Sequence, residues 1–332
     1  RGARRDAEPP ARAPAARVAT AGRRGASAAV EVGGQRITHP DRVVDPSTGL
    51  TKLDVARYYE AVAGAMLPHL RERPVSLTRA PDGIDGERFF QKHAPAASIP
   101  GIALLDASLD PGHAPLMAVP DRGALLGAAQ MNVIELHTWN AKARAIERPD
   151  RIVFDLDPGE GVSWSRVQEA ATLVRALLEE LELESWLKTS GGKGLHVVVP
   201  IAPGPSWAAA RGVSKGVVRH LARTLPDRFS ARPGDAHRRG RIFVDYLRNG
   251  RGATTVAAWS LRARPGLGVS VPVAWDELPS LSSGAHWTLR DAPRRLEDED
   301  PWAGAARRRQ RLTTAMKALD DVGALPDEAT AD

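Results

Sequence analysis

Apolar residues recur with two different periods along this chain of 332 residues. Helical spacing predicts helices over residues 51–70, 121–131, 165–181 and 206–225. The first begins at a variant of the capping box, in which Thr51 is followed by Asp54. Short apolar runs predict strands over residues 74–79, 89–92, 133–139, 151–157, 186–189, 195–201, 241–247 and 254–262. We predict that the charged segment 293–319 is helical.

This mixture of helices and strands predicts an α/β or α+β body built around a central mixed sheet. Before that body, residues 1–28 consist largely of Arg, Ala, Pro and Gly without periodicity, which is typical of a flexible basic linker or tail. The chain begins with Arg1 and not with Met, so it is either a piece of a longer polypeptide or a domain that stands alone. Residues 321–332 are expected to form a second tail.

Positive charge is concentrated at the N-terminus. The net charge is +6, and residues 1–28 hold seven arginines against Asp6 and Glu8. Nucleic-acid binding by the nearly neutral body must therefore be argued from local clusters. The chain has no cysteine, which excludes disulfides and thiolate ligands and leaves carboxylates and histidines to bind a metal. No apolar run could span a bilayer and no secretory signal is visible, so we expect a cytosolic protein.

Two carboxylates stand two residues apart in Ile152-Val-Phe-Asp-Leu-Asp-Pro158. On a strand, Asp155 and Asp157 point to the same face, about 7 Å apart. Ionised carboxylates on one face repel each other unless a cation lies between them. Two divalent ions bridging them would serve phosphoryl transfer. The alternative is a solvated strand end with two surface acids, and glycosyltransferases and phosphatases also use such pairs.

A glycine-rich turn, Thr189-Ser-Gly-Gly-Lys-Gly-Leu-His196, joins two predicted strands. Glycines in such a turn expose backbone N–H groups that can cradle a phosphate. Ser190 and His196 add donors, and Lys193 adds a cation. The turn leads into a strand and no Ser or Thr follows the Lys, so it is not a P-loop. A flexible hairpin turn is the alternative, but three glycines beside three polar groups favour an anion site.

A third carboxylate, Asp245, lies in the apolar run Ile242-Phe-Val-Asp-Tyr246. An unpaired charge is costly in an apolar strand. The side chain is therefore either a third metal ligand or the partner of a nearby arginine, of which the candidates are Arg238, Arg239, Arg241 and Arg248.

Cations and aromatic rings come together in Phe89-Phe-Gln-Lys92 and, earlier in the chain, Arg79. Aromatic faces can stack on a nucleobase while a cation lies beside the backbone. Taken alone, the two phenylalanines are more simply interpreted as core residues. His137 in Glu135-Leu-His-Thr-Trp139 is likewise more simply interpreted as a structural histidine.

Taken together, Asp155-Leu-Asp157, the turn from Ser190 to His196, and Asp245 resemble the polymerase domain of bacterial DNA ligase D, a member of the archaeo-eukaryotic primase superfamily. The resemblance runs from about residue 33 to about residue 320. It includes ordered smaller landmarks: Thr38-His-Pro-Asp-Arg42, Thr51-Lys52, Arg73-Pro-Val75, Phe89-Phe-Gln-Lys92, Glu135-Leu-His-Thr-Trp139 and Ser260-Leu-Arg-Ala-Arg264.

The resemblance implies a primase-like catalytic core with a central mixed, largely antiparallel sheet, similar to that of RNA-recognition motifs. A second α/β module would pack against this core. The domain would span residues 29–320 as a monomer. An N-terminal module with DNA-end contacts would occupy 29–130, a catalytic module 131–290 and a C-terminal helical segment 291–320.

The implied activity is the addition of nucleotides, preferably ribonucleotides, to 3′ ends of broken or gapped DNA in non-homologous end joining. The substrates would be NTPs or dNTPs, with two Mn²⁺ or Mg²⁺ ions. The catalytic residues and metal ligands would be Asp155, Asp157 and Asp245. The triphosphate would lie against Ser190, Lys193 and His196. The rest of the nucleotide pocket would consist of His137, Arg238 and Arg262.

Toward DNA, the resemblance implies that Arg42 and Lys52 hold the 5′-phosphate of the downstream strand. Arg42 stands where the family usually has Lys, which keeps the charge. A template base would stack on Phe89 or Phe90, with Arg79 and Lys92 nearby. The implied partners are gapped DNA, the ligase domain of the same polypeptide and Ku, in the bacterial cytoplasm at the nucleoid and without a membrane.

Two other functions use the same residues. A metal-dependent nuclease or phosphodiesterase would use the acidic cluster to activate water, although the turn at Ser190 favours a triphosphate. A catalytically silent DNA-end-binding module would not need all three carboxylates. Adenylation by this chain is not expected, because it contains no Lys-x-Asp-Gly motif.

Overall fold

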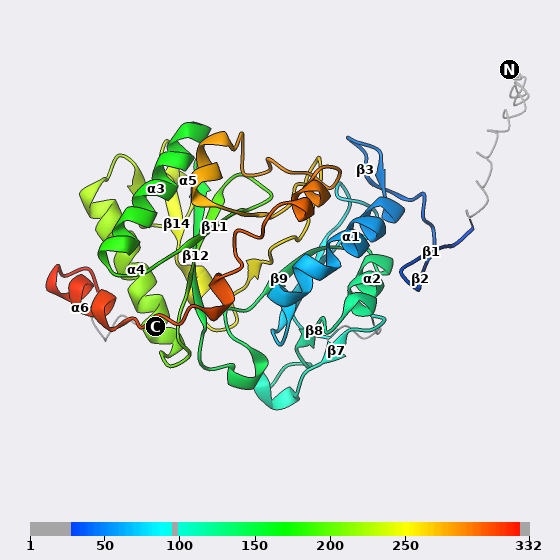
Figure 1. Cartoon of the computed structure of the whole chain (residues 1–332), viewed down its shortest axis with the longest axis horizontal. Helices are drawn as coiled ribbons and strands as arrows, with labels where there is room; N and C mark the ends of the chain where they lie inside the picture. The colour runs from blue at the N-terminus through cyan, green and yellow to red at the C-terminus, as the bar shows by residue number, and fades with distance from the viewer. Residues whose placement is uncertain (1–27, 95–98, 326–332) are drawn as a thin grey trace, which may run out of the picture.

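The computed structural model describes residues 28–94 and 99–325, and most of the two predicted tails lies outside these residues. Two six-stranded sheets form the centre of the protein. Helices α3 (Trp164–Glu180) and α4 (Trp207–Thr224) lie at one end of the molecule. Helices α1 (Lys52–Leu70) and α2 (Arg122–Gln130) lie at the other, with the strands between them (Figure 1).

The aspartate sheet, named for the three acids that it carries, has the order β13-β14-β10-β12-β11-β16. All its neighbouring strands are antiparallel except the pair β13–β14. This mixed, largely antiparallel arrangement confirms the expected fold class. Its strands are β10 (Arg151–Pro158), β11 (Trp186–Thr189), β12 (Leu195–Pro200), β13 (Phe229–Ser230), β14 (Ile242–Asp245) and β16 (Pro272–Val273).

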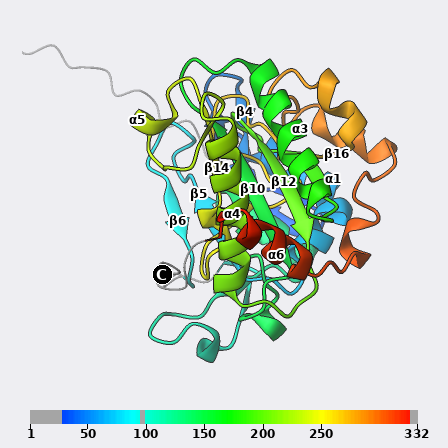
Figure 2. The same ribbon diagram turned by 90° about the vertical axis from the view of Figure 1, so that its left-hand side faces the viewer.

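Strand alternation gives the aspartate sheet one apolar and one polar face. On β10, Ile152, Phe154 and Leu156 are buried in a core that α3 and α4 cover. Figure 2 views the molecule from that side, with α3, α4 and α6 (Thr313–Asp321) in front of the strands. Asp155 and Asp157 therefore lie on the opposite face, as the sequence pattern predicted.

The N-terminal sheet has the order β15-β9-β5-β8-β7, with β6 also paired to β5. Its apolar face packs against α1 and α2 in a second core, to which Leu77 and Leu136 belong. The opposite face carries Thr78 and Glu135 as a cross-strand pair. Its strands are β5 (Val75–Arg79), β6 (Phe89–Gln91), β7 (Ala103–Leu104), β8 (Met117–Ala118), β9 (Val133–Thr138) and β15 (Thr255–Val256).

Helix α1 begins as the sequence predicted. Thr51 accepts a hydrogen bond from the Asp54 backbone, and the Asp54 carboxylate accepts one from the Thr51 backbone. Two small hairpins precede it: β1 (Val30–Val32) with β2 (Gln35–Ile37), and β3 (Val43–Asp45) with β4 (Leu50–Thr51). In the part of the chain that the structure describes, no helix combines the length and apolar character needed to cross a membrane.

The strand predicted over 254–262 is wrong beyond Val256. Trp259 has a φ of 67°, in the left-handed region that strands do not use, and its N–H donates to the Ser270 carbonyl. The chain turns here because the Ser260 N–H binds the Ala257 carbonyl. This turn directs Arg262 toward both sheets.

The segment 293–319, which was predicted to be helical, is helical only in part. The segment forms 3-10 helices at Ala292–Glu297 and Ala305–Arg307, and α6 follows. Acidic residues fill 297–300, and Pro301 disfavours helical backbone at Asp300. Trp302 is buried instead against the aspartate sheet, where its Nε1 donates to the Leu187 carbonyl.

Four further 3-10 turns and one short helix complete the secondary structure of the described residues. They are η1 (Ala107–Leu109), η2 (Ala143–Ala145), η3 (Leu247–Asn249), η4 (Trp275–Ser280) and α5 (Asp235–Arg238). Strand β9, which was expected in the catalytic module, pairs with β5 and β15 in the N-terminal sheet. The division of the domain into modules stays a prediction.

Candidate active site

Three carboxylates meet on the polar face of the aspartate sheet. Strand β10 lies between β14 and β12, so Asp155 stands opposite Asp245 on one side and opposite His196 on the other. Asp157 follows two residues later on the same face of β10. The structure therefore brings together the three aspartates that were predicted from two distant segments of the sequence.

Basic side chains contact each of the three acids. Arg238, on α5, forms an ion pair with Asp157. The Arg248 Nε lies 3.1 Å from Asp245 Oδ2 and 3.8 Å from Asp155 Oδ2. The ion-pair interpretation of Asp245 is thus realised by Arg248, and the same residue also reaches Asp155. The guanidinium groups of Arg238 and Arg248 therefore lie where the same carboxylates would attract a divalent cation.

The pKa values of the three carboxylates shift in different directions. The pKa of Asp157 is raised by burial and by the charge of Asp155, against the opposing charges of Arg238 and Lys193. Burial and the neighbouring acids likewise raise the pKa of Asp245, against Arg248. Burial would also raise the pKa of Asp155, but His196 and Arg248 lower it below the ordinary value. Like-charge repulsion inside the cluster is what a bound cation would relieve.

His196 lies beside Asp155 on the neighbouring strand β12 and is almost completely buried. Its side chain is only 3% exposed, and its Nε2 lies 3.2 Å from Asp155 Oδ1. Burial and the nearby Lys188 lower the pKa of His196 to about 4, so the ring is neutral at neutral pH. The ring therefore holds Asp155 in place. Direct contact of His196 with a triphosphate stays a prediction.

The glycine-rich turn is a rigid structure. The Ser190 hydroxyl oxygen accepts hydrogen bonds from the backbone N–H groups of Gly192 and Gly194, each at 3.1 Å. A Cβ on Gly194 would lie 1.9 Å from the carbonyl oxygen of Leu156, the residue between the two acids of β10. This close contact fixes the turn against the acidic strand. Lys193 is exposed and close enough to Asp157 to influence its pKa.

One carboxylate joins His137 to Arg262. The Glu135 side chain accepts from Arg262 Nε at 3.1 Å and from the backbone of Ala263 at 2.8 Å, and it lies 2.7 Å from His137 Nε2. Arg262 also donates to the carbonyl of Ser190 at 3.1 Å. Arg262 therefore links the polar face of the N-terminal sheet to the glycine-rich turn of the aspartate sheet.

The two phenylalanines of β6 are not core residues. Phe89 is 43% exposed and Phe90 is 49% exposed, so the simpler interpretation of this pair is wrong. The Phe90 ring meets His137 edge to face, with 5.5 Å between ring centroids. Arg79 stands opposite Phe89 on β5 and donates to the Met131 carbonyl, while Lys92 is exposed just beyond the strand.

Arg42 and Lys52 are neighbours, as a shared phosphate site requires. The Lys52 N–H donates to the Arg42 carbonyl at 2.8 Å. Lys52 is only 4% exposed, and burial together with the charge of Arg42 lowers its pKa to about 8. Arg42 is exposed and donates to the Pro81 carbonyl. Among the described residues, no hydrogen bond or ion pair joins this pair to the acidic cluster.

Sequence reasoning missed three residues of this region as site residues. Glu135 holds two residues of the predicted pocket, Arg248 contacts two of the acids, and the buried Lys188 stands opposite His196. The i,i+2 spacing of Glu135 and His137 on a strand was an available signal. Lys188 had no such signal, because its neighbours come from other strands.

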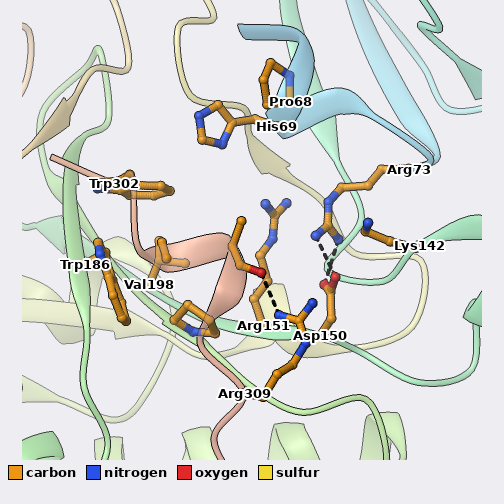
Figure 3. A pocket seen from close by; sticks show the side chains of 13 residues that line it. Pro68, His69, Arg73, Lys142, Asp150, Arg151, Trp186, Val198, Trp302 and Arg309 are labelled. Carbon is orange, nitrogen blue, oxygen red and sulfur yellow. Dashed lines mark hydrogen bonds and ion pairs between the residues drawn. The ribbon is translucent and has the colours of Figure 1, made fainter. Parts of the chain in front are cut away.

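A cavity of about 140 Å³ lies at the other end of the same sheet face (Figure 3). Trp186 and Trp302 line one side, and Arg73 on the other side pairs with Asp150 through two hydrogen bonds of 2.8 Å. Val198, two residues after His196, belongs to its wall. None of the predicted site residues lines it. The cavity is therefore separate from the acidic cluster.

The donor set of the acidic cluster suits a hard divalent ion. Its ligands would be carboxylate oxygens, which Mg²⁺ and Mn²⁺ prefer. The acids converge from adjacent strands, and two of them have a raised pKa because of burial and their mutual repulsion. The residues present therefore fit divalent metal binding.

Comparisons with known proteins show one family of relatives. Residues 51–302 match the family model described as the LigD primase-polymerase domain. The chain is 51% identical over 313 residues to the multifunctional non-homologous end joining protein LigD of Pseudomonas aeruginosa, covering 93% of this chain. It is 36% identical over 245 residues to the protein of the same description from Mycolicibacterium smegmatis, covering 73% of this chain.

The same matches cover only part of the relatives, 37% of the P. aeruginosa protein and 32% of the M. smegmatis protein. Among solved structures, the polymerase domain from Mycobacterium tuberculosis ligase D in complex with DNA matches with a TM-score of 0.73. That likeness covers 80% of this chain and 96% of the other, at 31% sequence identity.

Proposed function

This chain belongs to the LigD primase-polymerase domain family, whose fold is of the archaeo-eukaryotic primase type, and from that premise we propose that it adds nucleotides to 3′ ends of broken or gapped DNA. The family expected from the sequence is thereby confirmed. One observation carries the proposal for the reaction: Asp155, Asp157 and Asp245 converge beside a rigid turn that presents Lys193.

Asp155, Asp157 and Asp245 are the residues that would hold two Mn²⁺ or Mg²⁺ ions. Bound there, the ions would acidify the primer 3′-hydroxyl and neutralise the leaving pyrophosphate. His196 supports this arrangement from the neighbouring strand β12, because it fixes Asp155 Oδ1, while Arg248 lies 3.8 Å from Asp155 Oδ2. Arg238 and Arg248 balance the charge of the cluster before substrate binds.

Lys193 and Arg262 would position the incoming nucleotide. Lys193 reaches out from a turn that cannot shift easily, because the Ser190 hydroxyl and the contact of Gly194 with Leu156 hold it. Arg262 has its direction set by Glu135 and by the Ser190 carbonyl. Such preorganised cations stabilise developing phosphate charge without reorganisation during the reaction. His137, Arg238 and Ser190 complete this proposed pocket.

The DNA contacts would lie on the N-terminal sheet and the hairpin before α1. Exposed Phe90 meets His137 and so lies next to the proposed nucleotide pocket, which supports it as the ring that stacks on the template base. Phe89, Arg79 and Lys92 would line the template path. Arg42 and Lys52 would bind the 5′-phosphate across a gap.

The relatives are longer than this chain, so the setting of the reaction is part of the proposal. A ligase domain of the same polypeptide would seal the ends that this domain extends. Ku would hold the ends, and the reaction would take place in the bacterial cytoplasm at the nucleoid. A preference for ribonucleotides would suit repair that does not depend on dNTP supply.

Extension of a labelled primer in a gapped, 5′-phosphorylated duplex tests the proposal. The reaction is run with NTPs or dNTPs, and with Mn²⁺ or Mg²⁺. Lengthening that follows the template base supports a polymerase. Shortening of the strand without nucleotides would indicate a nuclease instead. DNA binding without either change would indicate an inactive end-binding module.

A further inference from the structure

A second group of potential metal ligands lies outside the acidic cluster. The His93 Nε2 is 2.8 Å from Asp110 Oδ2, and the His113 Nδ1 is 3.5 Å from the same oxygen. The three ligand atoms all lie within 4.8 Å of one another. Tetrahedral zinc with metal–ligand bonds near 2.0–2.1 Å separates its ligand atoms by roughly 3.3 Å. The spacing of this His93–Asp110–His113 cluster is therefore close to what zinc needs.

A tight turn supplies two of the three residues of the cluster. Asp110-Pro-Gly-His113 closes with a hydrogen bond from the His113 N–H to the Asp110 carbonyl at 3.3 Å. Pro at the second position and a Gly with φ 87° at the third are typical of a type II turn. The turn brings the carboxylate and the imidazole to the same side although they are three residues apart.

His93 comes to this turn from a fixed position. It lies just after β6 and forms an isolated antiparallel bridge with Leu116, and the next residue donates to the Pro115 carbonyl at 2.8 Å. The rings of His93 and His113 lie parallel, with 4.7 Å between their centroids. The three side chains therefore converge because backbone on both sides holds them.

The carboxylate of Asp110 also has the outer support that metal ligands usually have. Arg251 NH1 donates to Asp110 Oδ1 at 3.1 Å, which leaves Oδ2 facing the two imidazoles. Arg251 in turn pairs with Glu147 through its Nε at 2.9 Å. Asp110, Glu147 and Arg251 together carry one net negative charge, so the surroundings do not repel a cation.

We propose that His93 Nε2, His113 Nδ1 and Asp110 Oδ2 form a binding site for a zinc-type divalent cation. Water would supply the fourth ligand of a tetrahedral site. Binding would require the His113 ring to tilt away from the stack, which its 58% side-chain exposure permits. Two imidazoles with one carboxylate favour Zn²⁺ over Mg²⁺ or Mn²⁺, the opposite preference to the all-carboxylate cluster.

Metal at this site would join a second segment of the chain to the end of β6, the strand whose phenylalanines are proposed to contact the template. The ion would tie residues 99–116 to the end of β6, and β6 carries the exposed rings of Phe89 and Phe90. When zinc is added, the backbone amides of residues 99–116 would therefore exchange their hydrogens with solvent more slowly. The effect is structural and does not require the polymerase reaction.

Zinc retention by four forms of this chain tests the site. The wild type, His113→Ala, His286→Ala and Asp157→Ala are dialysed against micromolar Zn²⁺ and then against metal-free buffer, and bound zinc is counted by elemental analysis. We expect the wild type, His286→Ala and Asp157→Ala to retain one equivalent more than His113→Ala. Because His113 is exposed, its replacement is expected to leave the fold intact, which circular dichroism checks.

Two further measurements separate this site from the acidic cluster. Mn²⁺ binding followed by electron paramagnetic resonance should be weakened in Asp157→Ala and unchanged in His113→Ala. Co²⁺ should give the intense visible absorption of a tetrahedral site in the wild type and lose it in His113→Ala. Equal zinc retention by the wild type and His113→Ala would overturn the proposal. So would the absence of zinc-dependent amide protection in residues 99–116. The three residues would then form a hydrogen-bonded pair of stacked histidines that binds no metal.

Discussion

Asp155 and Asp245 stand directly opposite each other on the antiparallel strands β10 and β14. Like charges in directly opposed cross-strand positions destabilise a sheet. Here Arg248 lies within ion-pair distance of both acids, and His196 contacts Asp155 from the other side. The pair is therefore a destabilising arrangement that the Arg248 guanidinium and the contact with the neutral His196 ring make tolerable, as expected for a site kept for chemistry and not for stability.

Replacing Asp157 with Ala should reduce nucleotide addition by roughly 10²-fold or more, because the cluster loses a metal ligand. Binding of DNA should change little, since phosphate contacts by basic side chains dominate it. Primer extension and fluorescence anisotropy measure the two effects. Asp276→Ala, which removes a carboxylate elsewhere, serves as the control and should retain activity. Wild-type extension by Asp157→Ala would contradict the metal assignment.

Strand periodicity was sufficient to predict the acidic face. Alternation in β10 separates Ile152, Phe154 and Leu156 from the two aspartates, and the structure has both faces as expected. The capping box at Thr51 and the four long helices were also predictable, because their signals are local. Sequence spacing did not predict that Asp245 faces Asp155, since that depends on strand order in the sheet.

Other features depend on distant contacts, which a local pattern does not record. Phe89 and Phe90 look like core residues by composition, but they lie exposed on β6. Trp259 sits in an apolar run that resembles a strand, yet a hydrogen bond to Ser270 accompanies its left-handed backbone. The spacing of Glu135 and His137 on one strand was a local signal, but the contact of Glu135 with Arg262 depends on folding.

Glu135→Gln should loosen the nucleotide pocket and destabilise the protein. The change removes the charge that Arg262 and His137 share, and hydrogen bonds of charged groups contribute ~2 kcal/mol. The KM for the nucleotide should rise more than kcat falls, because the acids are untouched. Glu184→Gln, at an exposed ion pair with Arg308, should cost less than about 0.5 kcal/mol.

The same substitution has a pH signature. Although burial opposes it, His137, Arg262 and the backbone of Ala263 lower the pKa of Glu135 in the folded state. A depressed carboxyl pKa gives stability that is present above the unfolded pKa and is lost as pH falls toward the folded value. Urea unfolding should therefore show a constant difference between the wild type and Glu135→Gln above about pH 4.5, shrinking in acid. A difference that grows in acid would contradict this.

Recognition of the 5′-phosphate should weaken as pH rises through about 8. Burial and the charge of Arg42 lower the pKa of Lys52 to about 8, so its ammonium group is mostly neutral at pH 9 and mostly charged at pH 7. The ratio of affinities for gaps with and without the phosphate should fall over this range. Lys52→Ala should show a small ratio at every pH. Arg42→Ala should move the midpoint of this pH dependence upward, because the charge that lowers the Lys52 pKa is gone. An unmoved midpoint would mean that Arg42 does not act on Lys52.

A methyl group at Gly194 should damage the site more than one at another glycine. The new Cβ would lie 1.9 Å from the Leu156 carbonyl oxygen, so the glycine-rich turn or β10 must move. Gly194→Ala should lose roughly 1–3 kcal/mol of stability and most of its extension activity, since Asp155 and Asp157 flank Leu156.

Gly212, inside α4, provides the control. A methyl group there would meet no atom beyond the helix's own backbone within 4 Å, so Gly212→Ala should gain about 1 kcal/mol of stability from helix propensity. Urea midpoints and single-turnover extension measure both variants. Comparable activity in the two would mean that the turn does not need its contact with β10.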